Sequence, residues 1–427
     1  MTMNRNTLAL IALAISAFAI GTTEFISVGL LPLIADDLHI GLSTAGLTVT
    51  LYALGVTLGA PILTSVTAGM PRKMVLLGIM IVFIIGNGLA ATATGIGLLL
   101  MARIISALAH GIFMSIGSTI AASLVPEDRR ASAISIMFSG LTIATVTGVP
   151  IGTFIGQHLG WRVAFIVIVA IGVIALIANA LLIPARMEQG QRSGGWRAQT
   201  KLLTTSRILM ALVVTALGYG GTFVVFTYLS PLLHEISGFA PSRVALLLLF
   251  YGIAIAIGNV IGGRLANRNP VGVLLRMFIV QALVLLLLWW TAPYAGIGLA
   301  TVLLMGLFAF MNVSGLQVYV LMLAERYVPQ AVDMASALNI SAFNAGIAIG
   351  AYLGGLVVDH LGLIHTTWVG ALMVAAAAIL TAVLRAGEKQ EHVAGQGNIV
   401  EADAHNRSDA KATSGSACSA STTSLFR

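Results

Sequence analysis

Residues 162–184 read RVAFIVIVAIGVIALIANALLIP, a run with one charge at its first position and one polar amide, Asn179, near its end. A helix rises 1.5 Å per residue, so about 20 apolar residues span the hydrocarbon core of a bilayer. A strand that crosses a membrane needs only about half that length. The run therefore predicts a transmembrane helix, because only helices and closed barrels satisfy the backbone in lipid.

The whole chain has the composition of a membrane protein. Of its 427 residues, 58% are hydrophobic and only 9% are charged, against roughly 25% charged in an average soluble domain. The mean hydropathy is +0.99. So little charge cannot cover the surface of a soluble protein of this size. The single cysteine, Cys418, lies in the final polar stretch, which excludes an internal disulfide and a thiolate metal cluster. We expect neither a metal nor a cofactor.

Eleven more apolar stretches of similar length are bounded by charges or by Pro and Gly. Together with the first run they predict an all-α integral membrane protein with twelve transmembrane helices and short connections. The expected spans fall at about 7–31, 44–68, 74–93, 97–125, 131–157, 162–184, 208–233, 242–266, 271–292, 296–324, 331–359 and 364–385.

The placement of the basic residues predicts the orientation of these spans. Nineteen of the 22 Lys and Arg residues fall on the side of the N-terminus, two (Arg162 and Arg243) fall on the other side, and Arg103 lies within a span. By the positive-inside rule, both termini are then cytoplasmic. The formal net charge of +7 is explained by this topology, so it does not indicate a nucleic-acid partner.

The two halves of the chain repeat each other. A shift of 199 residues aligns Pro32 with Pro231 and Tyr52 with Tyr251. Two six-helix bundles in parallel repeat are typical of secondary transporters that hold their substrate near the bilayer midplane. We therefore expect a first bundle, a basic cytoplasmic linker along the lipid headgroups, a second bundle and a disordered cytoplasmic tail, at residues 1–184, 185–207, 208–385 and 386–427.

Three ionisable residues lie deep inside the expected spans, away from their ends, where such groups are costly and mark function: Glu24, Arg103 and His110. Glu24 is the only one of the fifteen acids far inside a span, and Arg103 lies at a similar depth. We predict that Glu24 loads and releases a proton during transport; its alternative role is a permanent ion pair with Arg103. His110 shares a helix face with Arg103 and serves either as a proton relay or as a packing contact.

Uncharged polar, aromatic and methionine side chains inside the spans are the candidates for a cargo site. Amides in lipid also join helices, and aromatic rings also pack, so packing is the alternative role of each. The candidates are Thr23, Asn87, Met114, Tyr219, Phe223, Phe226, Tyr251, Asn312, Gln317, Asn339, Phe343 and Asn344.

The fifth span carries a long Gly/Pro pattern. Gly140 is followed by Gly148, Pro150 and Gly152, then by Gly156. Glycines at i, i+4 and i+8 provide a smooth face for close helix approach, and a proline permits a bend. This pattern resembles the antiporter motif of the major facilitator superfamily, which marks its proton-driven drug exporters.

Other segments are similar to the same family. Arg103 with Gly111 behind it resembles the proton-coupling arginine motif. Residues 22–25 (TTEF), 109–111 (AHG) and 343–346 (FNAG) resemble the branch of arabinose-efflux, chloramphenicol-efflux and purine-nucleoside-efflux permeases. The resemblance covers residues 7–385. It implies two bundles that rock about a central site, with Glu24, Arg103 and His110 as the proton-coupling residues.

One motif departs from the family pattern. The loop after the second span usually carries an acid that latches the cytoplasmic gate, but Ala68 stands in its place here, and Asn267 does so in the second half. The basic pair Arg72 and Lys73 is retained and is expected at the membrane surface. We therefore assign no acidic latch.

The sequence predicts a proton-coupled antiporter in a bacterial inner membrane that exports a small neutral or weakly cationic molecule, such as a drug, a sugar or a nucleoside. Its expected partners are this cargo, protons and the lipid bilayer, and we expect a monomer. A proton-coupled uptake symporter is the alternative, and a non-transporting membrane protein is a second. A membrane enzyme would need a nucleophile and a base, or paired acids, in one cavity, and His110 with a single buried acid is not that set.

Overall fold

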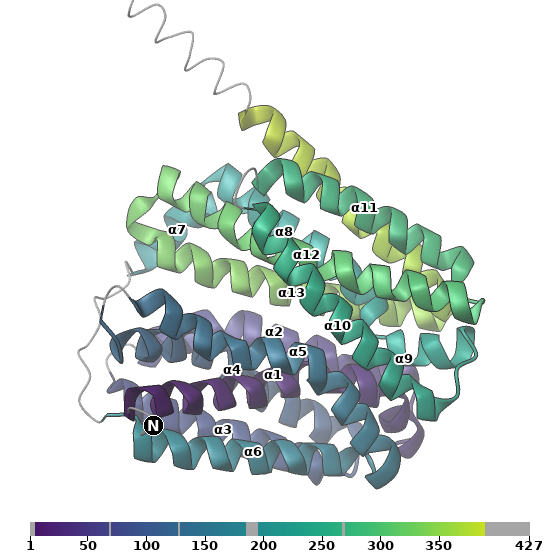
Figure 1. Ribbon diagram of the computed structural model, residues 1–427, viewed down its shortest axis with the longest axis horizontal. Coiled ribbons are helices and arrows are strands. Elements are labelled where there is room, and N and C mark those ends of the chain that lie inside the picture. Colours follow the sequence, from purple (N-terminus) through teal and green to yellow (C-terminus); the bar gives the residue numbers. More distant parts are fainter. Residues whose placement is uncertain (1–4, 68–69, 127–128, 185–194, 267–269, 389–427) are drawn as a thin grey trace, which may run out of the picture. The chain divides into compact units, whose positions relative to one another are not determined.

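A computed structural model describes residues 5–67, 70–126, 129–184, 195–266 and 270–388 (Figure 1). Within these ranges the chain forms helices and no strand, and twelve of the helices are long and apolar enough to cross a membrane. The twelve-helix prediction is therefore confirmed. Ala68, Asn267, the start of the expected linker and the expected tail from residue 389 lie outside the described residues.

The helices follow the predicted spans closely. The first six are α1 (Arg5–Asp37), α2 (Leu42–Thr67), α3 (Arg72–Ala91), α4 (Ile96–Ser123), α5 (Arg130–Leu159) and α6 (Trp161–Leu182). The expected linker contains a short helix, α7 (Gly195–Thr204). The second half holds α8 (Ser206–Phe226), α10 (Pro241–Ala266), α11 (Pro270–Thr291), α12 (Ala295–Tyr327), α13 (Val332–His360) and a last helix over Leu363–Glu388.

The seventh span was expected to be continuous over 208–233, and this was wrong. Helix α8 ends at Phe226, and the chain continues as the single turn α9 (Leu229–Pro231) and the π-helix η2 (Leu232–Ile236). Pro231 explains the break, because a proline ring collides with the carbonyl four residues earlier, here that of Thr227. Helix α1 passes through the equivalent Pro32 without interruption, so the two repeats differ at this point.

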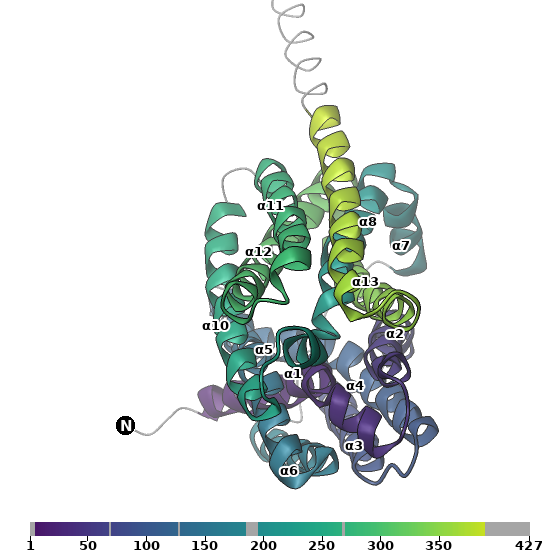
Figure 2. The same ribbon diagram turned by 90° about the vertical axis from the view of Figure 1, so that its right-hand side faces the viewer.

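Residues 1–381 form one compact unit, and residues 382–427 form a second, of which only residues 382–388 are described. In the first unit α1 packs on α5 and α6, and α4 packs on α2 and α3. Helix α12 similarly packs on α10 and α11, and α13 packs on α8. The two sets meet where α2 contacts α13 and α5 contacts α10, as Figures 1 and 2 show. The exact boundaries of two bundles remain a prediction.

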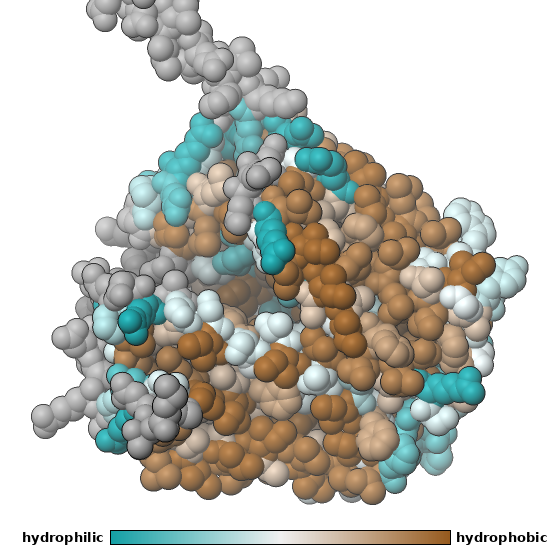
Figure 3. Space-filling view, viewed as in Figure 1, coloured by the Kyte–Doolittle hydropathy of each residue, from teal (hydrophilic) through white to brown (hydrophobic). Residues whose placement is uncertain are grey.

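The surface of the spanning helices suits lipid. Large apolar side chains are well exposed on several of them, including Leu181 (68% exposed), Leu283 (60%) and Ile379 (65%). Figure 3 shows hydrophobic residues over most of the visible face, with hydrophilic residues gathered near the helix ends. Exposed apolar area on this scale is excluded from water in a membrane protein.

Candidate functional site

Arg103 lies on α4 and is almost completely buried, with 1% of its surface exposed. Its guanidinium donates to backbone carbonyls of two neighbouring helices, to Thr23 O of α1 at 2.7 Å and to Thr48 O of α2 at 3.1 Å. It also stacks over the ring of Tyr52 at 4.1 Å. The planar fork of an arginine makes several directed contacts at once. Arg103 therefore ties α1, α2 and α4 together at one point.

Glu24 follows Thr23 on α1, and its side chain is half-buried. The Arg103 guanidinium reaches the backbone carbonyl of Glu24 at 3.5 Å, but among the described residues no ion pair joins the two side chains. The alternative role of Glu24 as a permanent ion-pair partner is therefore absent from this arrangement.

His110 lies on α4 two turns after Arg103 and is 3% exposed. Its Nδ1 lies 3.2 Å from the hydroxyl oxygen of Tyr52, and the two rings are 5.8 Å apart. Tyr52 thus contacts both Arg103 and His110, which places these two residues on one side of α4. Tyr52 was absent from the predicted site, although its repeat partner Tyr251 was included. Met114, one turn beyond His110, is buried.

The polar pair Thr23 and Asn87 is fully buried between α1 and α3. The Thr23 hydroxyl donates to Ala19 O at 3.0 Å and lies 3.3 Å from Asn87 Oδ1, while Asn87 Nδ2 donates to Phe83 O at 2.9 Å. The hydrogen-bonding groups of both side chains are thus used within the protein. In this arrangement the two side chains join α1 to α3.

A second polar chain joins three helices of the second half. The Thr215 hydroxyl of α8 donates to Asn339 Oδ1 of α13 at 2.8 Å, and Asn339 Nδ2 donates to Gln317 Oε1 of α12 at 2.7 Å. Gln317 Nε2 then donates to Ser336 Oγ at 2.7 Å. Two of the predicted cargo residues, Gln317 and Asn339, are thereby occupied as links between helices.

Six aromatic residues, here called the aromatic cluster, converge from α8, α10, α12 and α13. Ring centroids lie 5.0–5.4 Å apart for Tyr219 with Phe223, Phe310 and Phe343, and for Phe226 with Phe223 and Tyr251. Phe25, next to Glu24 on α1, lies 6.5 Å from Phe226. The aromatic cluster comprises Tyr219, Phe223, Phe226, Tyr251, Phe310 and Phe343. The sequence prediction included all of these except Phe310.

Several buried polar atoms in the second half have no hydrogen-bond partner among the described residues. Among the predicted cargo residues they are the Tyr251 hydroxyl, both amide atoms of Asn312, and Asn344 Oδ1. The other amide atom of Asn344, Nδ2, donates to Ile340 O at 3.0 Å. A buried polar group without a partner costs about 1–3 kcal/mol, so such groups call for an explanation, and a transient ligand is one.

The sequence profile of the Major Facilitator Superfamily matches residues 13–326, which is more than half of the chain. The chain belongs to the major facilitator superfamily. The uncharacterized MFS-type transporter YtbD of Bacillus subtilis (strain 168) is 68% identical over 383 residues, covering 90% of this chain and 96% of YtbD. The protein is thus a membrane transporter and not an enzyme, and the resemblance found in the sequence is confirmed.

Two further comparisons agree with this membership. A chloramphenicol resistance protein of Streptomyces lividans is 33% identical over 383 residues, covering 87% of this chain and 95% of that protein. The crystal structure of a bacterial homologue of the human lysosomal transporter Spinster, in an inward-facing and unoccupied conformation, matches with a TM-score of 0.69 at 14% identity. It covers 90% of this chain and 96% of the other, and the likeness shows the superfamily fold alone.

The glycines that resemble the superfamily's antiporter motif lie along the contact of α5 with α1. A Cβ at Gly140 would overlap the Ala14 carbonyl oxygen, and one at Gly148 would lie 3.2 Å from Thr22 Cα. Similar additions at Gly152 and Gly156 would meet Ile26 and Leu30. Pro150 lies inside α5. The absence of side chains on this face lets the two helices approach closely.

Gly140→Ala is expected to destabilise the protein. The new methyl group meets the backbone of α1, and overpacking of this kind costs roughly 1–3 kcal/mol. The midpoint of thermal unfolding in detergent measures the effect. Gly78→Ala is the matched control, because Gly78 lies inside α3 with nothing within 4 Å of an added Cβ. Equal midpoints for the two variants would contradict the close packing.

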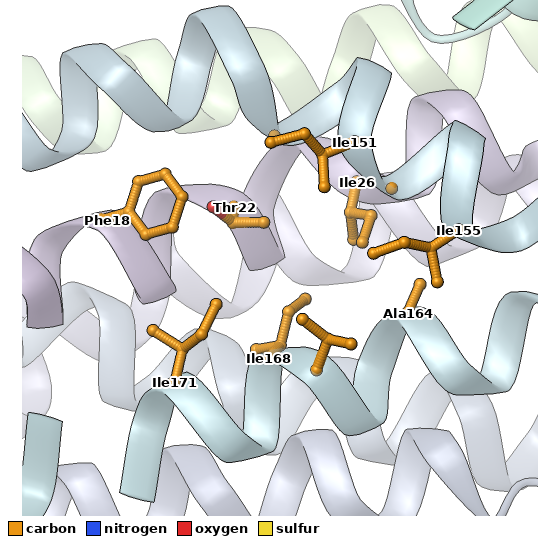
Figure 4. Close-up of a pocket in the computed structure, with 11 residues that line it drawn as sticks. Phe18, Thr22, Ile26, Ile151, Ile155, Ala164, Ile168 and Ile171 are labelled. Carbon is orange, nitrogen blue, oxygen red and sulfur yellow. The ribbon is translucent and has the colours of Figure 1, made fainter. Parts of the chain in front are cut away.

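An apolar crevice lies between this helix pair and α6 (Figure 4). Ile151 and Ile155 of α5, Phe18 and Ile26 of α1, and Ile168 of α6 point into it, and Thr22 is the one polar side chain that Figure 4 labels there. No charged residue lines it. Neither Arg103 nor any member of the aromatic cluster lines the crevice, and it holds no titratable side chain for proton binding.

Lys73 was expected at the membrane surface together with Arg72. Its Nζ donates to the carbonyls of Ala180 and Ile183 at 2.7 and 2.6 Å, and its place at the membrane surface stays a prediction. These carbonyls lie at the C-terminal end of α6, where helix carbonyls lack partners and a positive charge is favourable. Lys73 therefore caps α6, and Arg72 at the start of α3 is half-buried.

Proposed function

We propose that this protein is a proton-coupled antiporter that exports a small neutral or weakly cationic organic molecule. One juxtaposition carries the proposal: Glu24, which makes no ion pair among the described residues, lies beside Arg103, and the next residue along α1, Phe25, lies 6.5 Å from Phe226 of the aromatic cluster. A group that changes charge is thus next to a surface suited to an organic cargo. Such a neighbourhood lets proton binding and cargo binding influence each other.

Glu24 is the proposed proton carrier. Its carboxylate is half-buried, and Arg103 is held by carbonyls of α1 and α2 rather than by that carboxylate. A change in the packing of α1 against α4 therefore alters the field at Glu24 without breaking an ion pair first. A proton that crosses the membrane potential supplies about 2.3 kcal/mol per 100 mV, which drives the export of cargo.

Tyr52 and His110 are the proposed extension of this proton site. The hydroxyl of Tyr52 and the ring nitrogen of His110 lie 3.2 Å apart, a distance at which a proton passes between them. The ring of Tyr52 also fixes the guanidinium of Arg103. Both proposed roles of His110, relay and packing, are compatible with this contact.

The aromatic cluster is the proposed cargo surface. Its rings provide area for an apolar or aromatic body, and the Tyr251 hydroxyl and the Asn312 amide have no partner among the described residues. A cargo with donors and acceptors would satisfy such groups. Arg103, the basic side chain beside Glu24, is already engaged by carbonyls, so an anionic cargo is disfavoured.

Tyr251→Phe tests this assignment and leaves the ring stack in place. Removing a buried hydroxyl without a partner avoids a cost of about 1–3 kcal/mol, so the thermal midpoint should stay equal or rise. The half-saturating cargo concentration should rise by about tenfold if one hydrogen bond to cargo is lost. Tyr294→Phe, at an exposed tyrosine, is the control. A fall in stability with unchanged cargo affinity would contradict the role.

Export, rather than uptake, is supported by the glycine face of α5 and by the printed name of the Streptomyces lividans relative, a chloramphenicol resistance protein. We place the transporter in a bacterial inner membrane with both termini in the cytoplasm, following the distribution of basic residues. Drugs, sugars and nucleosides all remain in the proposed cargo class.

A growth screen tests the function and narrows the cargo. A strain that overproduces the protein is compared with one that overproduces the Glu24→Gln variant, across panels of amphenicols, other drugs, sugars and nucleosides. We expect raised tolerance to at least one compound with the unmodified protein only. Raised sensitivity that depends on Glu24 would indicate uptake instead, and identical growth on every compound would count against the proposal.

A further inference from the structure

Tyr228 occupies the break between α8 and α9 and is completely buried. Under the repeat of 199 residues its counterpart in the first half is Gly29, which lies inside the unbroken α1. The second half thus has a large aromatic side chain where the first has none, at the one place where the two equivalent helices differ in path. Tyr228 therefore serves the second half alone, with no counterpart of its kind in the first.

The Tyr228 side chain is seated between α2 and α13. A Cβ at Gly46 of α2 would overlap the Tyr228 hydroxyl, and Cβ atoms at Gly354 and Gly355 of α13 would lie 2.8 Å from its Cε2 and its hydroxyl oxygen. The hydroxyl donates to Ala351 O of α13 at 3.1 Å. Three glycines therefore form the seat, one from the first half and two from the second.

This seat lies at one end of the contact between the halves. Gly46 is near the start of α2, just after the end of α1 at Asp37, and Gly354 and Gly355 are near the end of α13. A Cβ at Gly355 would also lie 3.3 Å from Ser43 Cβ, so α2 and α13 are in close approach here. At the same end Gln157 Nε2 of α5 donates to Pro241 O of α10 at 2.6 Å.

We propose that Tyr228 is a latch that holds the two halves together at the Asp37 end. The hydrogen bond to Ala351 fixes the ring to the second half, and the glycine at position 46 lets the first half close over its hydroxyl. Separation of α2 from α13 would empty the seat and lose these contacts. Tyr228 thereby stabilises the arrangement seen here relative to one that is open at this end. The proposal does not depend on proton coupling or on the cargo.

Distance measurements by electron paramagnetic resonance test the latch. Cys418→Ser removes the single native cysteine, and Leu159→Cys with Leu361→Cys places one spin label on each half at the Asp37 end; both leucines are exposed and neither contributes to the seat. With Tyr228 and Gly46 unmodified, most molecules should show the shorter of two distances between the labels, the one that belongs to the arrangement closed at the Asp37 end. Gly46→Ala and Tyr228→Ala should each raise the ratio of longer to shorter distances by about fivefold or more, the shift that about 1 kcal/mol produces.

The double variant Gly46→Ala with Tyr228→Ala distinguishes a specific contact between these two residues from a general loss of stability. Once Tyr228→Ala has emptied the seat, a methyl group at position 46 has no hydroxyl to meet. Gly46→Ala should therefore add nothing to the effect of Tyr228→Ala. Gly88→Ala is the control, because an added Cβ there has nothing within 4 Å and the distances should not change.

Tyr228→Phe provides a variant that keeps the ring and loses only the bond to Ala351, and its effect should be smaller than that of Tyr228→Ala. If Tyr228→Ala does not fold, as judged by its elution and thermal midpoint, then Gly46→Ala and Tyr228→Phe decide the question. Unchanged distances in Gly46→Ala would overturn the latch, and so would fully independent effects of the two substitutions in the double variant.

Discussion

Glu24→Gln is expected to abolish proton-driven export while the protein stays folded in the membrane. Glutamine has the shape of glutamate but carries no exchangeable charge, and no ion pair to Arg103 is lost because none joins the two side chains among the described residues. The carboxylate is the proposed proton carrier, so the variant should be left with facilitated movement of cargo at most. Export from loaded vesicles under an imposed proton gradient measures this loss.

Glu325→Gln is the matched control for that substitution. Glu325 is exposed near the end of α12, away from Arg103 and from the aromatic cluster, and its removal should leave export unchanged. Export by Glu24→Gln at the rate of the control would remove Glu24 from the mechanism. A fall in the thermal midpoint of Glu24→Gln without loss of transport would assign it a structural role instead.

Arg103→Lys is the second substitution with a large expected effect. One ammonium group cannot reach Thr23 O and Thr48 O in the directions that the guanidinium does, nor can it stack in the same way on Tyr52. Each charge-assisted hydrogen bond is worth about 1.5–3 kcal/mol, so loss of one is expected to slow export by about tenfold or more. The thermal midpoint should fall as well, because α1 and α2 lose their link through α4.

Arg243→Lys is the control, at an exposed arginine near the start of α10, and it should change neither the export rate nor the thermal midpoint. The pair of measurements distinguishes a need for the guanidinium geometry from a need for positive charge. Full export by Arg103→Lys would show that charge alone suffices, and it would contradict the role assigned here to the carbonyl contacts.

The twelve helices could be predicted from the sequence because each span is a long apolar run, as residues 162–184 illustrate. Lipid makes this signal strong, since a spanning helix must satisfy its own backbone. The break after Phe226 was missed, because a proline inside a span predicts a bend or a break only in combination with its packing. Pro32 in the uninterrupted α1 shows the other outcome.

The charged part of the site was predictable for a similar reason. Glu24, Arg103 and His110 stand out because ionisable groups are rare inside spans. Tyr52 and Phe310 were missed because aromatic residues are common there, and only the fold shows that Tyr52 touches both Arg103 and His110. The repeat that pairs Tyr52 with Tyr251 was the one signal that pointed to it.

The structure divides the polar candidates into two groups that the sequence alone could not distinguish. Thr23 with Asn87, and Gln317 with Asn339, are bound to other protein groups, whereas Asn312 and Tyr251 have buried atoms without partners in the described chain. These residues have the same kinds of side chain in the same kind of span. Whether an amide joins helices or faces a ligand depends on partners that are distant in the sequence, such as Thr23 and Asn87, which are 64 residues apart.

The central claim is that cargo leaves in exchange for protons, with Glu24 as the carrier. Purified protein in vesicles with an enclosed pH-sensitive dye tests it most directly, once the growth screen has supplied a cargo. With no imposed proton gradient, a gradient of that cargo should drive protons in the opposite direction in the unmodified protein and drive none in Glu24→Gln. Protons that move in the same direction as the cargo, or an unchanged proton flux in Glu24→Gln, would contradict the account.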